Sequence, residues 1–219
     1  MLGWAGSILG MLKARYAILL DGGFVTKKLA EQLKAIPTAA DVVNLCEKLK
    51  ASPLLVDYEL LRIYYYDAPP STEAIRQPIT GDQVQLGTTT RARTAQSLYD
   101  QLELTDSFAL RMGETRISPH IWKIKPNVAR ALARAPRPLT DNDFALDIGQ
   151  KGVDIRIGLD MARLALRDTV RAVVVVTGDS DFVPAFKFVR REGVKVMLST
   201  MGHKPARREL KAHSDFVID

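Results

Sequence analysis

The stretch from residue 172 to residue 195, AVVVVTGDSDFVPAFKFVRREGVK, constrains the fold more than any other part of the sequence. Its residues Val173–Val176 are β-branched and apolar without alternation, which is typical of a strand buried on both faces. After a Thr-Gly turn, Phe182–Glu192 predicts a helix that ends at Gly193, and Val194–Leu198 predicts a second buried strand. The stretch is therefore half of a βαβ unit, in which ligands bind beyond the carboxyl ends of the strands.

Aspartate follows three of the predicted strands. The strand at Tyr16–Leu20 ends in Asp21, the strand at Leu61–Tyr66 ends in Asp67, and the Val-rich strand is followed by Asp179. An aspartate in such a position is also a common helix N-cap, so any one of them alone fits a structural role. The recurrence of the pattern favours a functional role.

Another candidate, Asp154, opens a helix that we expect from about residue 153 to residue 167. Asp160 lies on the same helix, but the two residues differ by about 240° around the helix axis and about 9 Å along it, so they cannot share one ion. Asp160 instead has Arg156 and Arg163 at ion-pair spacing, which predicts a structural role. The apolar stripe of this helix, which we expect to face the core, is Ile155, Leu159, Ala162 and Leu166.

The remaining elements are less regular. We expect helices at Val25–Ile36, Ala39–Ala51, Ala95–Leu104, near Val128–Ala135 and near Pro205–His213, strands at Phe108–Met112 and Phe216–Ile218, and a long loop at Pro69–Thr94. Tyr64, Tyr65 and Tyr66 are candidates for stacking on bases, although at least one of them should point into the core.

Composition and charge favour some classes of function and disfavour others. The net charge is +6, and residues 111–140 are rich in Lys and Arg, which is typical of a surface for polyanions but also of a solvated basic surface. A single cysteine excludes an internal disulfide and fits a reducing, cytoplasmic setting. We expect the apolar opening residues to be neither a signal peptide nor a membrane span, because Lys13 and Arg15 end the apolar run. The absence of Gly-rich phosphate-binding motifs disfavours a nucleotide cofactor.

The parallel βα units bring Asp21, Asp154, Asp179 and Asp181 to one edge of the sheet. Two carboxylates about 6 Å apart repel by roughly 3 kcal/mol at an effective dielectric near 20, a cost that bound protons or a cation remove. A cluster with only oxygen ligands suits Mg²⁺ or Mn²⁺ rather than zinc. Metal-assisted hydrolysis of a phosphodiester is the chemistry that such a site supports best.

Three motifs together resemble the NYN domain, in its LabA-like branch, which belongs to the PIN-like nuclease superfamily. They are Asp21-Gly22-Gly23, Gln150-Lys151-Gly152-Val153-Asp154 and Thr177-Gly178-Asp179-Ser180-Asp181-Phe182-Val183-Pro184. The resemblance implies a Rossmann-like, mostly parallel sheet flanked by helices, Mg²⁺ or Mn²⁺ at the four aspartates, and RNA as the substrate. The family often has an acidic residue matching Asp160. Phe24 is a departure, because many members have asparagine there.

We therefore expect an α/β protein with a lead-in at residues 1–15 and one NYN/PIN-like domain at residues 16–219, which carries an irregular basic insertion at about residues 69–147. The main hypothesis is an Mg²⁺- or Mn²⁺-dependent endoribonuclease acting on single-stranded RNA. In it Asp21, Asp154 and Asp179 hold the metal, Asp181 completes the site, and Lys151, Arg91 and Arg93 contact phosphates. Alternatives are a non-catalytic RNA- or protein-binding module of the same fold, or a small-molecule phosphatase or phosphodiesterase. A second copy of the chain or another protein remains a possible partner, and no membrane is expected.

Overall fold

The structure, a computed structural model, describes residues 13–202 and 208–218. Its strands are β1 (Ala14–Asp21), β2 (Tyr58–Asp67), β3 (Ala74–Arg76), β4 (Gln83–Gln85), β5 (Phe108–Met112), β6 (Glu114–Ile124), β7 (Phe144–Lys151), β8 (Ala172–Val176), β9 (Lys195–Ser199) and β10 (Phe216–Val217). Its helices are α1 (Gly22–Leu33), α2 (Ala39–Lys50), α3 (Thr90–Glu103), α4 (Pro126–Arg134), α5 (Val153–Leu166), α6 (Val183–Arg191) and α7 (Arg208–Ala212). The expected lead-in up to residue 12 and the start of the helix expected near Pro205 lie outside the described residues.

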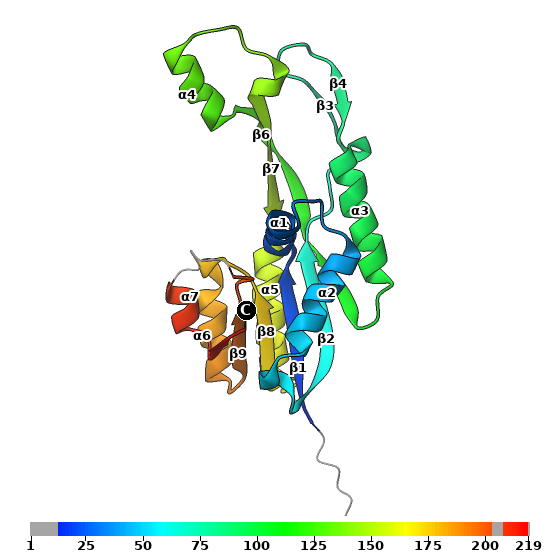
Figure 1. Ribbon diagram of the computed structural model, residues 1–219, viewed down its shortest axis with the longest axis vertical. Helices are drawn as coiled ribbons and strands as arrows, with labels where there is room; N and C mark the ends of the chain where they lie inside the picture. Colours follow the sequence, from blue (N-terminus) through cyan, green and yellow to red (C-terminus); the bar gives the residue numbers. More distant parts are fainter. Residues whose placement is uncertain (1–12, 203–207, 219) are drawn as a thin grey trace, which may run out of the picture.

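Six parallel strands form the central sheet in the order β10-β9-β8-β1-β2-β5 (Figure 1). All five residues of β8 are buried, as the run of valines predicts for a central strand. The mixed α/β architecture, with a mostly parallel sheet between helices, confirms the expected fold class.

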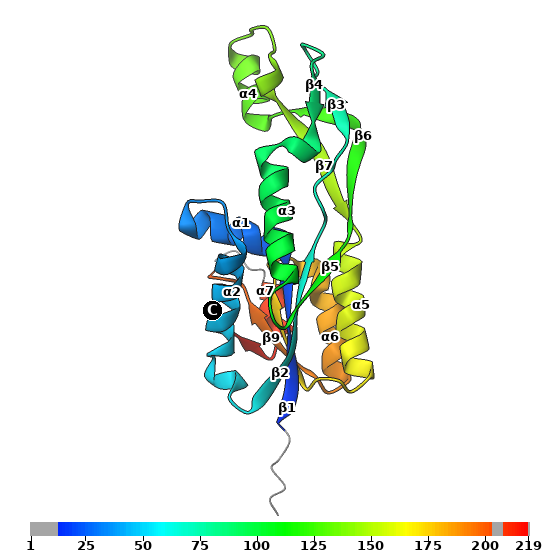
Figure 2. The same ribbon diagram turned by 90° about the vertical axis from the view of Figure 1, so that its right-hand side faces the viewer.

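Alternating side chains of the strands build two cores, one on each face of the sheet. Tyr16, Ile18 and Leu20 of β1 point to the face that α1, α2 and α3 cover, while Ala17 and Leu19 point to the face covered by α5 and α6. Figure 2 shows α1 and α2 on one side of the sheet and α5 and α6 on the other. The three neighbouring tyrosines of β2 are all buried, at 6%, 0% and 0% exposed. The idea that they stack on bases is therefore wrong.

The strand order reverses between β1 and β8. From β1 the chain continues through α1 and α2 to β2 on one side, whereas from β8 it continues through α6 to β9 on the other. The connections after β1 and β8 thus leave toward opposite faces, which opens a crevice beyond the ends of these two strands. Such a switch point is where open α/β sheets bind their ligands.

Helix α5 faces the core with a different side from the one expected. Its buried residues are Val153, Ile157, Met161, Leu164 and Ala165. Ile155, Leu159 and Leu166 of the expected core stripe are 65%, 64% and 63% exposed. At 100° per residue this stripe lies on the side of the helix opposite the core. The assignment of the stripe to the core was wrong, because α5 carries apolar residues on both sides.

Two chain segments that connect elements of the central domain together form an arm. We define this arm as residues 69–89, which follow β2, and residues 114–151, which follow β5. It contains the antiparallel pairs β3–β4 and β6–β7 together with α4, and it rises from the carboxyl edge of the sheet (Figures 1 and 2). The indole of Trp122 on β6 donates a 2.7 Å hydrogen bond to the carbonyl of Arg76 on β3. Pro69–Thr94, expected to be a loop, therefore contains a hairpin that is attached to the β6–β7 ribbon.

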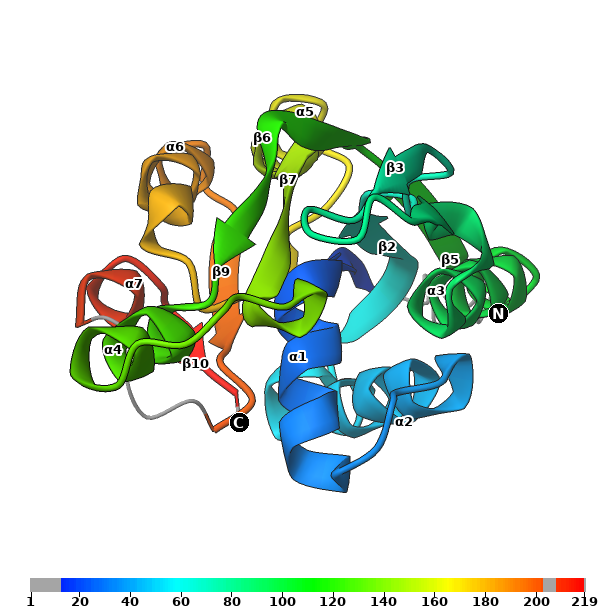
Figure 3. The ribbon, with the colours of Figure 1, turned by 90° about the horizontal axis from the view of Figure 1, so that it is seen from above.

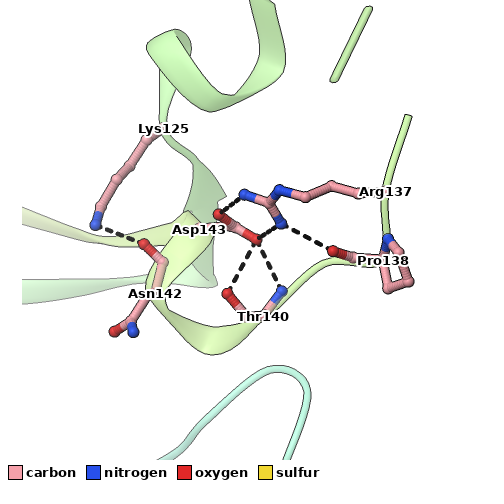
Figure 4. A network of polar contacts seen from close by, with 6 residues as sticks. All are labelled: Lys125, Arg137, Pro138, Thr140, Asn142 and Asp143. Atoms are coloured by element: carbon pink, nitrogen blue, oxygen red, sulfur yellow. Dashed lines mark hydrogen bonds and ion pairs between the residues drawn. The ribbon is translucent and has the colours of Figure 1, made fainter. Parts of the chain in front are cut away.

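A salt-bridged network fixes the turn at the far end of the arm (Figure 4). Asp143 accepts two hydrogen bonds from the Arg137 guanidinium, at 2.6 and 2.7 Å, and others from the backbone N–H and hydroxyl of Thr140. The hydrogen bonds from Arg137 hold the pKa of the Asp143 carboxyl well below its usual range. Asp141 also accepts a hydrogen bond from the Ile79 backbone, which joins this turn to the β3–β4 hairpin.

Candidate functional site

Asp21 and Asp179 are linked through one threonine at the switch point. Asp21 is the last residue of β1, and Thr177 directly follows the neighbouring strand β8. The Thr177 hydroxyl donates a 2.9 Å hydrogen bond to Oδ2 of Asp21 and accepts one of 3.1 Å from the backbone N–H of Asp179. Parallel pairing of β1 with β8 therefore brings two carboxylates from distant parts of the sequence to one edge.

Burial changes the acidity of Asp21. Its pKa is raised from 3.8 to about 6, mainly because the carboxyl is removed from water, and the charges of Asp154 and Asp67 add to this effect. Hydrogen bonds from the Phe24 backbone N–H and the Thr177 hydroxyl act in the opposite direction. The side chain of Asp21 also caps the N-terminus of α1, so this residue combines the structural and the electrostatic roles that the sequence left open.

Asp154 lies in the first turn of α5, within electrostatic range of the β8 turn. Its pKa is raised, first by partial burial and then by the charges of Asp179 and Asp181. The backbone N–H of Asp181 donates a 2.9 Å hydrogen bond to Asp179 Oδ1, so the first of these two aspartates also caps the short 3₁₀ turn Ser180–Phe182. Asp154 thus interacts electrostatically with Asp21 on one side and with Asp179 and Asp181 on the other.

Among the described residues, the ion pairs involve other carboxylates and leave these four aspartates without an arginine or lysine partner. Asp160 is different: it accepts a hydrogen bond of 3.0 Å from the Tyr66 hydroxyl and forms ion pairs with Arg111 and Arg163, both at 3.2 Å. Arg163 is the helical neighbour expected from the spacing, whereas Arg111 comes from β5. Asp160 therefore serves as a structural link between α5 and the sheet.

Asp67 and Gln150 join the arm to the site, a role that the sequence did not reveal. Asp67 ends β2, is only 6% exposed, and accepts a 2.6 Å hydrogen bond from the Gln150 side chain near the end of β7. Its pKa is raised because burial outweighs its hydrogen bonds. The strand-end position of Asp67 was visible in the sequence, but its partner on a strand more than eighty residues away was not.

Close packing, rather than a turn, explains two glycines at this edge. A Cβ atom on Gly22 would lie 2.6 Å from the Tyr66 carbonyl oxygen, so only glycine lets α1 begin directly beside β2. A Cβ atom on Gly178 would lie 2.5 Å from the ring of Phe24. Phe24 thus packs against the β8 turn.

A pocket of about 280 Å³ lies between α1 and the β8 turn. It is lined by Asp21, Phe24, Lys27, Lys28, Gly178, Asp179 and Ser180. Figure 3 looks down on this edge of the sheet, with α1 extending from the end of β1. No motif in the sequence pointed to the two lysines, because their place in the pocket depends on how α1 crosses the strand ends.

The three basic side chains that we expect to contact phosphates lie on two different elements of the fold. Lys151 ends β7 next to the α5 N-terminus, and Arg91 and Arg93 lie in the first turn of α3; all three are exposed. The positive charge of residues 111–140 is partly neutralised, because ion pairs bind Arg111 to Asp160, Arg116 to Glu114, Lys123 to Asp147 and Arg137 to Asp143. Arg130 and Arg134 remain exposed on α4.

The carboxylate oxygens at this edge suit a hard divalent cation, but few of them can hold one ion together. In residues 13–202 and 208–218, no three His, Cys, Asp or Glu side chains lie close enough together to surround a metal ion. Mg²⁺ is commonly bound by one or two carboxylates and keeps several waters. Asp21 and Asp179 offer oxygen ligands of this kind, and the mutual repulsion of the neighbouring carboxylates favours a bound cation.

The fold is that of a mixed α/β protein with a mostly parallel sheet between helices, which is consistent with a PIN-like fold. Residues 117–219 match the family model of the NYN domain, which supports the presence of an NYN domain in this part of the chain. The matched part includes Asp154, Asp179 and Asp181. No curated protein matches the sequence.

A crystal structure of a protein of unknown function from Vibrio parahaemolyticus is similar to this fold. The two chains superpose with a TM-score of 0.53 over 95% of this chain and 93% of the other, at 16% sequence identity. At this identity the similarity shows a shared fold alone. None of the described helices has the length and apolar character needed to cross a membrane.

Proposed function

We propose that this protein is a divalent-metal-dependent ribonuclease that cleaves single-stranded RNA internally, in a reducing, cytoplasmic setting. The observation that carries the proposal is the chain of hydrogen bonds from Asp21 through Thr177 to Asp179 at the switch point, beside a pocket. The NYN match over residues 117–219 supports nuclease chemistry. The LabA-like branch is part of the proposal.

In this proposal Asp21 and Asp179 hold the cation, which is Mg²⁺ or Mn²⁺. Bound there, it supplies an activated water and stabilises charge on the leaving oxygen. Thr177 orients both aspartates, because its hydroxyl touches one carboxylate and the backbone of the other residue. Asp154 and Asp181 add negative charge that strengthens cation binding.

Cations around the site hold the RNA backbone. Lys151 lies next to the N-terminal turn of α5, and Arg91 and Arg93 lie in the first turn of α3. Phosphate contacts position a nucleic acid without reading its sequence. The exposed Arg130 and Arg134 of the arm extend this surface away from the sheet.

A non-catalytic RNA-binding module of the same fold is the second candidate. It is favoured by one observation, that the described residues hold no group of three acidic, His or Cys side chains able to surround a metal. In this alternative the basic arm binds RNA and the aspartates serve only as helix caps. A third possibility is hydrolysis of small phosphate esters at the same acidic edge, and an assay of the same protein tests it.

The test is cleavage of end-labelled single-stranded RNA with Mg²⁺ or Mn²⁺. Asp179→Asn should abolish cleavage while the protein stays folded by circular dichroism. Asp168→Asn is the matched control, because this aspartate is exposed, pairs with Arg171 and sits after the far end of α5; its activity should equal the wild type. RNA binding without cleavage in either metal would select the non-catalytic module, and turnover of chromogenic phosphate esters alone would select the third.

A further inference from the structure

The pocket at the switch point carries opposite charges on two walls. Asp21 and Asp179 come from the strand ends, whereas Lys27 and Lys28 come from α1. The carboxylates suit a cation, and the ammonium groups suit an anion. A phosphate that is bound to a divalent cation satisfies both walls at once, because its oxygens can contact the metal and the lysines together.

Lys28 is buried to an extent that is rare for lysine. The residue is 8% exposed, and its side chain forms an ion pair of 2.6 Å with Glu31 one turn further along α1. The side chain of Glu31 is 52% exposed, so the pair connects a solvent-facing carboxylate to an ammonium group at the pocket wall. Lysine is almost never fully buried unless it is paired, and this ion pair with Glu31 holds the ammonium group in place.

An ammonium group has three N–H donors. In the described part of the chain, the hydrogen bond of Lys28 to Glu31 uses one of them, which leaves capacity for phosphate oxygens. Lys27 is exposed at the mouth of the same pocket and adds a second positive charge. The pocket volume of about 280 Å³ lies at the lower limit of small-molecule sites, which are about 300–1,000 Å³, so it suits a phosphate with its cation better than a whole nucleotide.

We propose that this pocket is a phosphate subsite in which Lys28, with Lys27, binds a non-bridging oxygen of a backbone phosphate beside the Asp21–Asp179 cation site. The inference rests on the proposed function, since it names the group of the RNA that enters the acidic edge. Lys28 is a positioning and binding residue for that phosphate, and the subsite contacts the backbone rather than the bases. Binding there is therefore independent of RNA sequence.

The experiment measures binding of a short fluorescein-labelled oligouridylate by fluorescence anisotropy at a series of salt concentrations, with Ca²⁺ held at one concentration so that the carboxylates of the pocket have a divalent cation. Lys28→Met keeps the apolar stem and removes the charge. Loss of a charge-assisted contact should raise Kd at least about tenfold, and the slope of log K against log salt should fall in magnitude by about 0.7, the value for one phosphate contact on a single strand. Lys48→Met, on the exposed side of α2, is the matched control and should change neither quantity.

Further variants separate a phosphate contact from a structural role. Lys28→Arg should restore the salt slope because it keeps a cation, and Glu31→Gln should leave that slope unchanged because Lys28 remains. Lys27→Met provides an exposed second site if Lys28→Met does not fold, with an expected rise in Kd of about threefold and the same change in slope. An unchanged salt slope in Lys28→Met, or in Lys27→Met if the former is unfolded, overturns the subsite, as does a wild type that does not bind the oligonucleotide.

These experiments distinguish failure of the phosphate subsite from failure of the nuclease proposal. If wild-type protein cleaves RNA but Lys28→Met binds and cleaves as the wild type does, the subsite is wrong and the nuclease stands. If wild-type protein binds RNA with a salt slope that depends on Lys28 but never cleaves it, the subsite stands and the catalytic proposal fails.

Discussion

Replacing Asp21 by asparagine tests the electrostatics of the site. Burial raises the pKa of this carboxyl from 3.8 to about 6 in the folded protein. The folded state therefore binds the proton more tightly than the unfolded chain, and the free energy of unfolding falls as the pH rises between these two values. Above about pH 6 the ionised carboxylate costs the fold about 3 kcal/mol, because each pKa unit corresponds to about 1.4 kcal/mol.

Asparagine has the same shape as aspartate but does not titrate. Its carbonyl oxygen can accept one of the two hydrogen bonds that Asp21 receives from Phe24 and Thr177, and losing the other costs about 1 kcal/mol. We therefore expect Asp21→Asn to be more stable than the wild type by about 2 kcal/mol near pH 7.5, and less stable by about 1 kcal/mol near pH 4.

The assay is urea unfolding followed by circular dichroism at both pH values, with Asp168→Asn as an exposed control whose free energy of unfolding should change by less than about 1 kcal/mol. Mg²⁺ at pH 7.5 should stabilise the wild type by mass action and stabilise Asp21→Asn less, because one ligand is lost. Equal destabilisation of Asp21→Asn at both pH values would refute the assignment of a buried, charge-repelled carboxylate at this position.

Three further substitutions test the packing, each by its free energy of urea unfolding. Thr177→Val removes the hydroxyl that donates a hydrogen bond to Asp21, and it should lower the free energy of unfolding by about 1–3 kcal/mol. An unchanged free energy of unfolding would contradict the chain of hydrogen bonds from Asp21 through Thr177 to Asp179. Met161→Ala should cost about 2–5 kcal/mol, whereas Leu159→Ala should stay within about 0.5 kcal/mol, and equal losses would show that the two sides of α5 are wrongly assigned. Gly22→Ala should cost about 1–3 kcal/mol, since its Cβ would lie 2.6 Å from a carbonyl oxygen of β2, and a neutral effect would mean that α1 begins farther from that strand.

Most of the sheet could be predicted because its signals are local. The valines of β8 and the Gly193 that ends α6 act within a few residues, and the structure contains both elements within one residue of the expected bounds at most ends. The same locality explains the error on α5. A helix that is apolar on two sides has two possible core faces, and only packing against β2 and α6 decides between them.

The arm could not be predicted from local patterns. Strands β3 and β4 have three residues each, which is too short for an alternation to be recognised. Their position depends on distant contacts, such as the indole of Trp122 with Arg76 and the carboxylate of Asp141 with the Ile79 backbone. Such contacts leave no trace in spacing or composition.

The candidate site shows the same division between local and distant causes. Asp21, Asp154 and Asp179 were predictable because each sits at the end of a strand or the start of a helix, where a short motif marks it. The contact of Gln150 with Asp67 was not, because it joins the end of β7 to the end of β2. Since Asp154 follows β7 by only three residues, this contact and the close approach of Gly113 to the Lys151 carbonyl hold the root of the arm and the start of α5 together. The arm that is proposed to bind RNA is thus joined directly to the helix that carries Asp154, which favours a backbone-binding surface that leads into the acidic edge.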